Sequence, residues 1–150
     1  MIKIENISKK FGERLVLDDI SVTFERGKTN LIIGQSGSGK TVLMKICIGL
    51  FEPDNGSVIF DDRQFSNTKE KFKSDIRKEM GVLFQGGALF DSMNVEQNVM
   101  FPLNMFTDLS YEEKLERVNF CLNRVNLNGI NDMMPSELSG GMMKRVAIAR

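Results

Sequence analysis

The sequence predicts an α/β fold in which antiparallel strands precede a strand, a glycine-rich loop and a helix. Apolar side chains alternate with polar ones at Ile2 and Ile4, and again over residues 20–24, which is the period of half-buried strands. A continuous apolar run at residues 31–33 is typical of a buried strand in a parallel sheet. Helical spacing dominates the second half of the chain, so we expect a helical region there.

The middle of the chain continues the α/β pattern. After the glycine-rich loop, Leu43, Ile46 and Leu50 lie on one helical face, which predicts a helix over residues 40–50. Next we expect, in order, a turn at residues 53–56, a strand at 57–60, an exposed charged helix at 67–79 and a short apolar strand at 80–84.

Capping patterns mark the later helices. Residues 94–97 open a short helix with such a pattern, and residues 110–113 form a clearer capping box. Helical spacing follows the second box until residues 128–129, Asn-Gly, stop the helix. Ser139 is placed to cap a last helix that runs to Arg150.

Composition and charge exclude several classes of protein. The chain has 150 residues, enough for one domain with a substantial core. Lys plus Arg equals Asp plus Glu at 20 each, which argues against a nucleic-acid partner. No apolar run approaches the roughly 18 residues that span a bilayer, so we expect no direct membrane insertion. The chain has no histidine, which excludes histidine catalysis within these residues, and Cys47 and Cys121 match no metal or redox spacing.

A phosphate-binding loop is the most specific motif in the chain. Residues 34–41 read GQSGSGKT and match GxxxxGK[ST] in full, between a predicted strand and a predicted helix. Glycines let successive N–H groups point at phosphate oxygens, and the helix N-terminus adds partial positive charge. We expect Lys40 to reach the β- and γ-phosphates and the Thr41 hydroxyl to bind Mg²⁺. The alternative is a chance Gly/Ser turn. The residues expected to hold the nucleotide here are Gly34, Gln35, Ser36, Gly37, Ser38, Gly39, Lys40, Thr41 and Val42.

A second motif, residues 138–142, reads LSGGM and resembles the signature sequence LSGGQ of ATP-binding-cassette (ABC) ATPases, with Met142 in place of Gln. Alone, a Ser-Gly-Gly turn is weak evidence, although a capping serine beside glycines is again an anion site. Gln85 directly follows a predicted strand, as the Q-loop glutamine does in that family. With the phosphate loop, these motifs make all 150 residues resemble the ATPase subunit of an ABC transporter.

The resemblance implies ATP as the nucleotide and roles for single residues. Gln85 would touch Mg²⁺ and the attacking water and contact the membrane subunit, so Lys40 and Gln85 are the expected catalytic residues. Phe11 falls where the family places an aromatic ring that stacks on adenine. Ser139, Gly140 and Gly141 would close on the γ-phosphate held by a second copy. The alternatives are a polar loop residue for Gln85 and a core side chain for Phe11.

A narrower likeness lies in residues 84–95, which read FQGGALFDSMNV, together with residues 98–99 and 101–103. These residues and the Met of the signature resemble the Mla-type phospholipid transport ATPase, the partner of MCE proteins. In the family this stretch lies near the transmembrane permease. Some apolar residues here would suit an adaptable partner surface, or else form the core of the helical subdomain, namely Phe90, Met93, Met100, Phe101 and Met105.

The family also has parts that do not occur in these residues. Its acidic strand end, catalytic glutamate and switch histidine follow the signature helix, so we expect a truncated chain that binds ATP without cleaving it. The family's later strands lie between the strands corresponding to residues 31–33 and 81–84. We therefore expect an incomplete core sheet, or association between copies through the unpaired edges.

These observations predict a P-loop NTPase fold of the ABC type, with an N-terminal antiparallel β-subdomain, a partial RecA-like core and a helical signature subdomain. Residues 1–150 would form one domain, divided at about residue 85 into a β-subdomain with the phosphate-loop core and a Q-loop and helical part. The expected function is the ATP-binding subunit of an ABC transporter that drives lipid transport, cytoplasmic and held at the inner face of the membrane by its permease. The alternative is a non-hydrolysing nucleotide-binding or association module.

Overall fold

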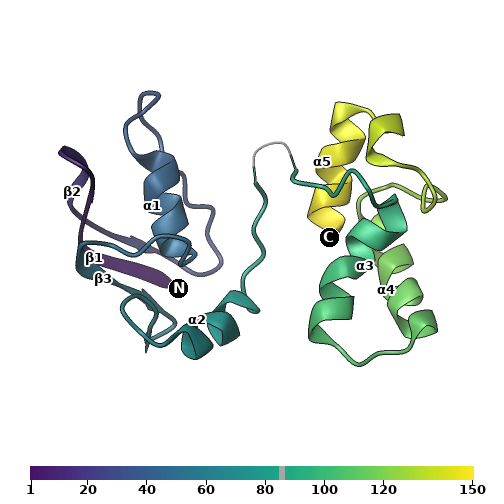
Figure 1. The fold of residues 1–150 in the computed structure, drawn as a ribbon, viewed down its shortest axis with the longest axis horizontal. Coiled ribbons are helices and arrows are strands. Elements are labelled where there is room, and N and C mark those ends of the chain that lie inside the picture. The colour runs from purple at the N-terminus through teal and green to yellow at the C-terminus, as the bar shows by residue number, and fades with distance from the viewer. Residues whose placement is uncertain (85–86) are drawn as a thin grey trace. The chain divides into compact units, whose positions relative to one another are not determined.

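The computed structural model describes residues 1–84 and 87–150, which form two compact units, Met1–Gly81 and Val82–Arg150. Figure 1 shows strands and two helices in the first unit and only helices and loops in the second. This division agrees with the α/β class expected from the sequence, in which strands come first and helices dominate later.

The first unit is built on one antiparallel sheet. Its strand order is β2-β1-β3-β4, and Ile4 of the inner strand β1 lies opposite Val22 on one side and Val58 on the other. Ile4 and Val58 are buried, so the alternation read from the sequence is the inward face of this sheet. The strands are β1 (Ile2–Phe11), β2 (Arg14–Phe24), β3 (Asn55–Phe60) and β4 (Arg63–Gln64).

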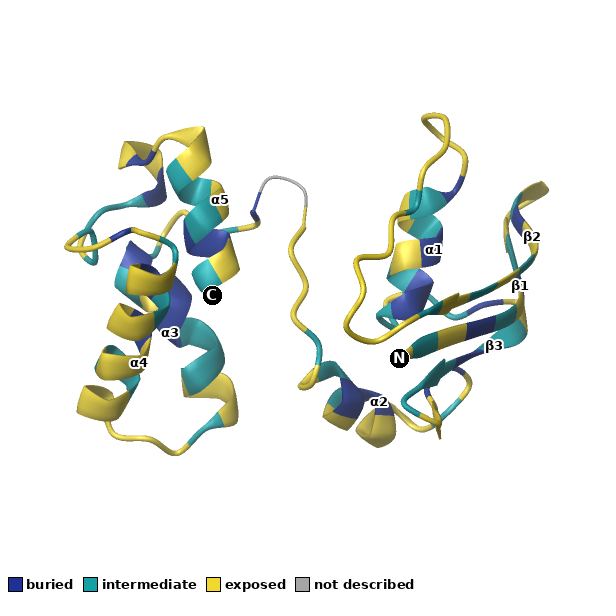
Figure 2. Ribbon diagram, turned by 180° about the vertical axis from the view of Figure 1, so that it is seen from behind, coloured by how far each residue is buried: buried dark blue, intermediate teal, exposed yellow. Residues whose placement is uncertain are grey.

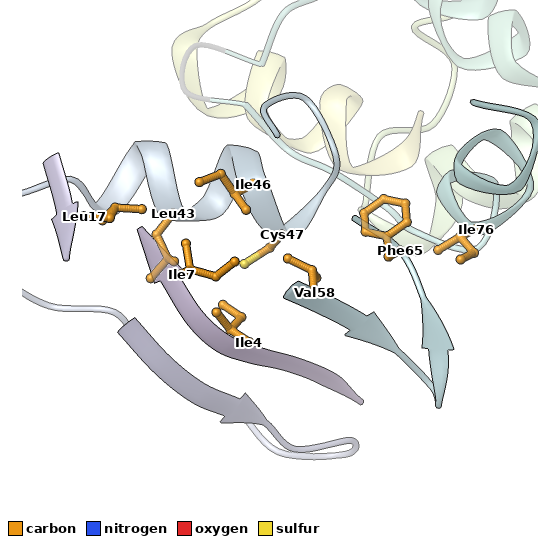
Figure 3. Close-up of a cluster of buried hydrophobic side chains, with 9 residues drawn as sticks. All are labelled: Ile4, Ile7, Leu17, Leu43, Ile46, Cys47, Val58, Phe65 and Ile76. Atoms are coloured by element: carbon orange, nitrogen blue, oxygen red, sulfur yellow. The ribbon is translucent and has the colours of Figure 1, made fainter. Parts of the chain in front are cut away.

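Helix α1 (Lys40–Cys47) closes the core of the first unit. Leu43, Ile46 and Cys47 are its buried residues, and Figure 3 shows them directed at the side chains of the sheet. Burial raises the pKa of the Cys47 thiol to about 11, because the thiolate would lose its hydration, so this cysteine stays protonated. The apolar contact holds the start of α1, and with it the preceding glycine-rich loop, against the sheet.

Helix α2 (Glu70–Arg77) is shorter and less exposed than the sequence predicts. Ile76 packs in the core with Phe65, and Lys73 is buried while its ammonium pairs with Glu52. The lysine aliphatic stem contributes apolar surface while its charge keeps a partner. A charged composition alone therefore misses the buried face of this helix.

The parallel strands predicted at residues 31–33 and 80–84 are not present. Both segments lack ladder pairing, and Figure 2 shows mostly exposed residues along them, although Ile32 and Met80 are half-buried against the core. Leu31 and Ile33 are each 81% exposed. A strand is stable only when a neighbour accepts its backbone hydrogen bonds, and no described strand lies beside either segment. The described sheet is antiparallel throughout, so the expectation of an incomplete core sheet is confirmed.

The second unit is helical. Its core joins buried side chains of all three α-helices, including Val99, Val118 and Val146. None of the described helices has an apolar stretch long enough to cross a membrane. The helices are α3 (Val95–Phe106), α4 (Tyr111–Arg124), the 3-10 helix η1 (Pro135–Glu137) and α5 (Gly140–Ala149).

Both predicted capping boxes are confirmed. The Asn94 side chain accepts a hydrogen bond from the Gln97 N–H at the start of α3, and the Gln97 side chain accepts one from the Asn94 N–H. Ser110 and Glu113 exchange the same pair of bonds at the start of α4. Each box satisfies backbone donors that a helix start leaves unpaired.

Asn98 holds the loop that leads into α3. Its side chain is fully buried, and its Oδ1 accepts a hydrogen bond of 2.8 Å from the Phe90 N–H. Its Nδ2 donates to the carbonyls of Phe90, Met93 and Asn94 at 3.1, 2.9 and 3.0 Å. One amide thus satisfies four backbone groups of the loop.

We expect Asn98→Ala to destabilise the second unit by about 3 kcal/mol, because the Phe90 N–H and the Met93 carbonyl lose the hydrogen-bond partner that the buried amide provides. Urea unfolding followed by the helical circular dichroism signal measures this loss. Asn104→Ala is the matched control, since Asn104 is exposed on the same helix, and its cost should stay within about 0.5 kcal/mol. Equal unfolding midpoints for the two variants would contradict the role of Asn98.

Candidate phosphate-binding site

The glycine-rich loop has the backbone geometry that a phosphate site needs. Gly37 and Gly39 adopt φ of 78° and 94°, and the Ser38 N–H donates to the Gln35 carbonyl at 3.2 Å. Positive φ is a conformation that glycine adopts at little cost. A Cβ added at Gly39 would lie 2.9 Å from Leu17 Cδ2. Two constraints therefore require glycine at position 39: the positive φ and the close approach of the loop to β2.

The start of α1 offers backbone donors to an anion. Gly39 is the N-cap residue, and no side chain accepts a hydrogen bond at this cap. The first N–H groups of a helix have no partner within the helix, and the helix dipole places partial positive charge there. Thr41, in this first turn, is exposed, so its hydroxyl is accessible to a bound ion.

Backbone carbonyls of the loop hold the Lys40 side chain in place. Its ammonium donates to the carbonyls of Gly34 at 2.8 Å and Gln35 at 2.6 Å. An ammonium has three N–H donors, so these two bonds leave one for a ligand and fix the direction of the charge. The predicted phosphate-binding lysine is thus oriented before any anion binds.

A cavity of about 270 Å³ adjoins the loop and adds residues that the motif does not contain. The phosphate loop and α1 contribute Gly37, Gly39, Lys40, Thr41 and Val42 to its lining, and β2 contributes Arg14 and Val16. Neither β2 residue was predicted from the sequence. The signal that could have found Arg14 is the β1–β2 hairpin, in which Arg14 lies opposite Phe11.

Phe11 lies at the end of β1 and is 44% exposed. Its ring meets Phe51 edge to face, with centroids 5.6 Å apart, and the Lys9 ammonium lies 5.7 Å from its centroid. Within the described part of the chain, Phe11 does not line the cavity beside the phosphate loop. Its stacking on adenine stays a prediction. Gln85 lies outside the described residues, so its predicted role is not addressed by the structure.

The signature-like loop lies in the second unit. Ser139 caps α5, because its Oγ accepts a hydrogen bond from the Met142 N–H at 3.3 Å. A Cβ added at Gly140 or Gly141 would meet no described atom within 4 Å. Packing among the described residues therefore gives no reason for glycine at these two positions. They leave exposed backbone that another molecule can approach closely.

The apolar residues proposed for a partner surface divide into two groups. Met100 is 5% exposed and belongs to the core of the second unit, so for this residue the core alternative holds and not the partner surface. The Phe90 and Phe101 rings pack with centroids 4.8 Å apart, while Met105 is 60% exposed. Met100 belongs to the same buried cluster as Val118 of α4 and Val146 of α5. An apolar side chain alone does not show whether it lies in a core or on a partner surface.

Comparison with known proteins identifies the family. The family model described as "ABC transporter" matches residues 17–150. The chain belongs to the ABC transporter family. This ABC chain is 38% identical over its whole length to the intermembrane phospholipid transport system ATP-binding protein MlaF of Haemophilus influenzae, and 41% identical to MlaF of Escherichia coli K12. It is 39% identical over 149 residues to the probable ribonucleotide transport ATP-binding protein mkl of Mycobacterium bovis.

The ABC chain spans about half the length of these relatives, namely 57%, 56% and 42% of the three proteins. Solved ABC cassettes share its fold. The dimeric cassette MJ0796 bound to ADP and Pi has a TM-score of 0.88 at 31% identity, covering 99% of this chain and 68% of that one. CbiO1 from Clostridium perfringens has a TM-score of 0.85 at 29% identity, covering 99% and 59%. The predicted P-loop NTPase fold of the ABC type is therefore confirmed.

Proposed function

We propose that this ABC chain binds MgATP at residues 34–42 and belongs to the motor subunit of a lipid transporter. The observation that carries the proposal is the Lys40 ammonium, fixed by two loop carbonyls beside the uncapped start of α1. Fixed positive charge and free backbone donors together match the β- and γ-phosphates of a nucleotide.

Magnesium would depend on the nucleotide for most of its ligands. No cluster of three or more Asp, Glu, Cys or His side chains suited to a metal occurs in the part of the chain that the structure describes. Mg²⁺ is commonly held by one or two protein oxygens together with substrate phosphates and water. The exposed Thr41 hydroxyl fits that arrangement, and Gln85 is the second ligand we propose. Catalysis in the whole protein would rest on positioning and on charge at the phosphates, with Lys40 and Gln85 as participants.

A second copy would complete the site. The bare glycines at 140 and 141 and the capped start of α5 offer an anion site that no described residue fills. We propose that Ser139, Gly140 and Gly141 contact the γ-phosphate held by the partner copy. The solved cassette MJ0796 is described as dimeric, which supports this assembly.

Lipid transport is the activity we propose for the whole protein. Its support is the identity to MlaF proteins, whose names specify intermembrane phospholipid transport, although mkl is named for ribonucleotide transport. A transmembrane permease would be the partner that α3 and the loop before it contact, which would place the protein at the cytoplasmic face of the membrane. Adenine stacking by Phe11 completes the proposed nucleotide site.

Calorimetric titration with MgATP tests the binding proposal. We expect saturable binding of ATP and of ADP, and weaker ATP binding when EDTA removes magnesium. No binding at millimolar ATP would contradict the proposal. A phosphate-release assay on the same chain separates the two readings of function, because turnover identifies an enzyme and binding without turnover identifies a nucleotide-binding module.

A further inference from the structure

Arg14 is placed at the phosphate loop by the β1–β2 hairpin. It is the first residue of β2, and the register pairs it directly with Phe11 across the turn formed by Gly12 and Glu13. Directly opposite residues of antiparallel strands project from the same face of the sheet. Arg14 also lines the cavity that contains Gly37, Gly39, Lys40, Thr41 and Val42.

The guanidinium of Arg14 makes no interaction with the described residues that would explain an arginine at this position. No hydrogen bond or ion pair joins it to any residue of 1–84 or 87–150, and its side chain is exposed. Two other arginines of the same unit are occupied, since Arg63 pairs with Glu79 and Arg77 with Glu70. Arg14 is therefore a cation free to bind a ligand in the cavity.

We propose that Arg14 binds the phosphate tail of the nucleotide and is a second cationic contact beside Lys40. This inference rests on the proposed function of the loop. The rest of the cavity lining is the phosphate loop itself and the apolar side chains of Val16 and Val42, so the anion is the part of the ligand that matches the guanidinium. A planar guanidinium can donate two parallel hydrogen bonds to one phosphate, which a lysine ammonium cannot do.

The two cations come from different elements and act differently. Lys40 lies on α1 and is held by loop carbonyls, whereas Arg14 lies on β2 and reaches the cavity from the hairpin. Binding through both would tie the hairpin to the loop when nucleotide is present. In the proposed site, positive charges from two different elements, α1 and β2, therefore both contact the phosphate tail.

The test compares Arg14→Gln with Arg26→Gln, using two probes, MgATP and inorganic tripolyphosphate, which has no base or sugar. Arg26 is the matched control, because it is an exposed arginine just beyond the other end of β2. Its Nη2 lies 3.7 Å from Asp61 Oδ2. We expect Arg14→Gln to weaken both probes about tenfold, Arg26→Gln to leave both unchanged, and Arg14→Lys to retain part of the affinity. Circular dichroism of each variant confirms an unchanged fold.

Unchanged affinity of Arg14→Gln for both probes would overturn the proposal. Weaker MgATP binding with unchanged tripolyphosphate binding would also overturn it, because Arg14 would then act on the base or sugar. If the unaltered chain binds neither probe, the proposed function fails and this inference fails with it. Binding by the unaltered chain with no loss in Arg14→Gln contradicts the role of Arg14 alone.

Discussion

Replacing Lys40 by alanine is expected to remove measurable MgATP binding, with a loss of more than about a hundredfold in affinity. The substitution deletes the ammonium that the carbonyls of Gly34 and Gln35 hold over the loop. The phosphates would lose a fixed positive charge, and the two carbonyls would lose their donor. Calorimetric titration of both forms of the chain measures the change.

Lys45→Ala is the control for this substitution. Lys45 lies on the same helix α1, but its ammonium lies 5.1 Å from the centre of the Phe51 ring, and among the described residues no hydrogen bond joins its side chain to the phosphate loop. We expect its MgATP affinity to match that of the unaltered chain. If Lys40→Ala and Lys45→Ala bind MgATP equally well, Lys40 is not the phosphate ligand.

Gly56→Ala is expected to cost the first unit more than about 3 kcal/mol and to disrupt the pairing of β1 with β3. Gly56 has φ of 86°, and a Cβ there would lie 2.3 Å from the Glu5 carbonyl oxygen and 2.4 Å from that of Asn6. These atoms belong to the backbone of the neighbouring strand, so they cannot move without breaking the ladder. Thermal or urea unfolding of the variant measures the loss.

Gly12→Ala separates this clash from ordinary backbone strain. Gly12 also has positive φ, at 57°, but a Cβ there meets nothing within 4 Å. Gly12→Ala should lower the free energy of unfolding of the first unit by about 1 kcal/mol, because alanine disfavours the left-handed backbone conformation. Similar losses for Gly12→Ala and Gly56→Ala would show that steric contact with β1 is not what requires glycine at position 56.

Features set by neighbours in the chain could be predicted. The capping boxes at Asn94 and Ser110, the cap at Ser139 and the alternation around Ile4 all appear in the structure as expected. Each depends on residues a few positions apart or on the period of a single strand, so the sequence contains the whole interaction. The division of the domain at about residue 85 stays a prediction.

Features set by distant residues were predicted less well. The apolar segments at residues 31–33 and 80–84 have the composition of strands but pair with no described strand. Gly56 was assigned to a turn, whereas it lies in β3 against Glu5 and Asn6. Strand formation and close packing both need a partner segment from elsewhere in the chain, and the composition of one segment does not identify which segment that is.

The sequence by itself determined that this protein contains the phosphate-loop motif, because Gly34, Gly39, Lys40 and Thr41 have the spacing GxxxxGK[ST] within eight residues. Only the tertiary structure decided that the Lys40 ammonium is held by loop carbonyls and that Arg14 shares the cavity. The physical reason is that a sequence motif depends on residues close together in the chain. The β1–β2 hairpin and helix α1, in contrast, come into contact only when the core between them is packed.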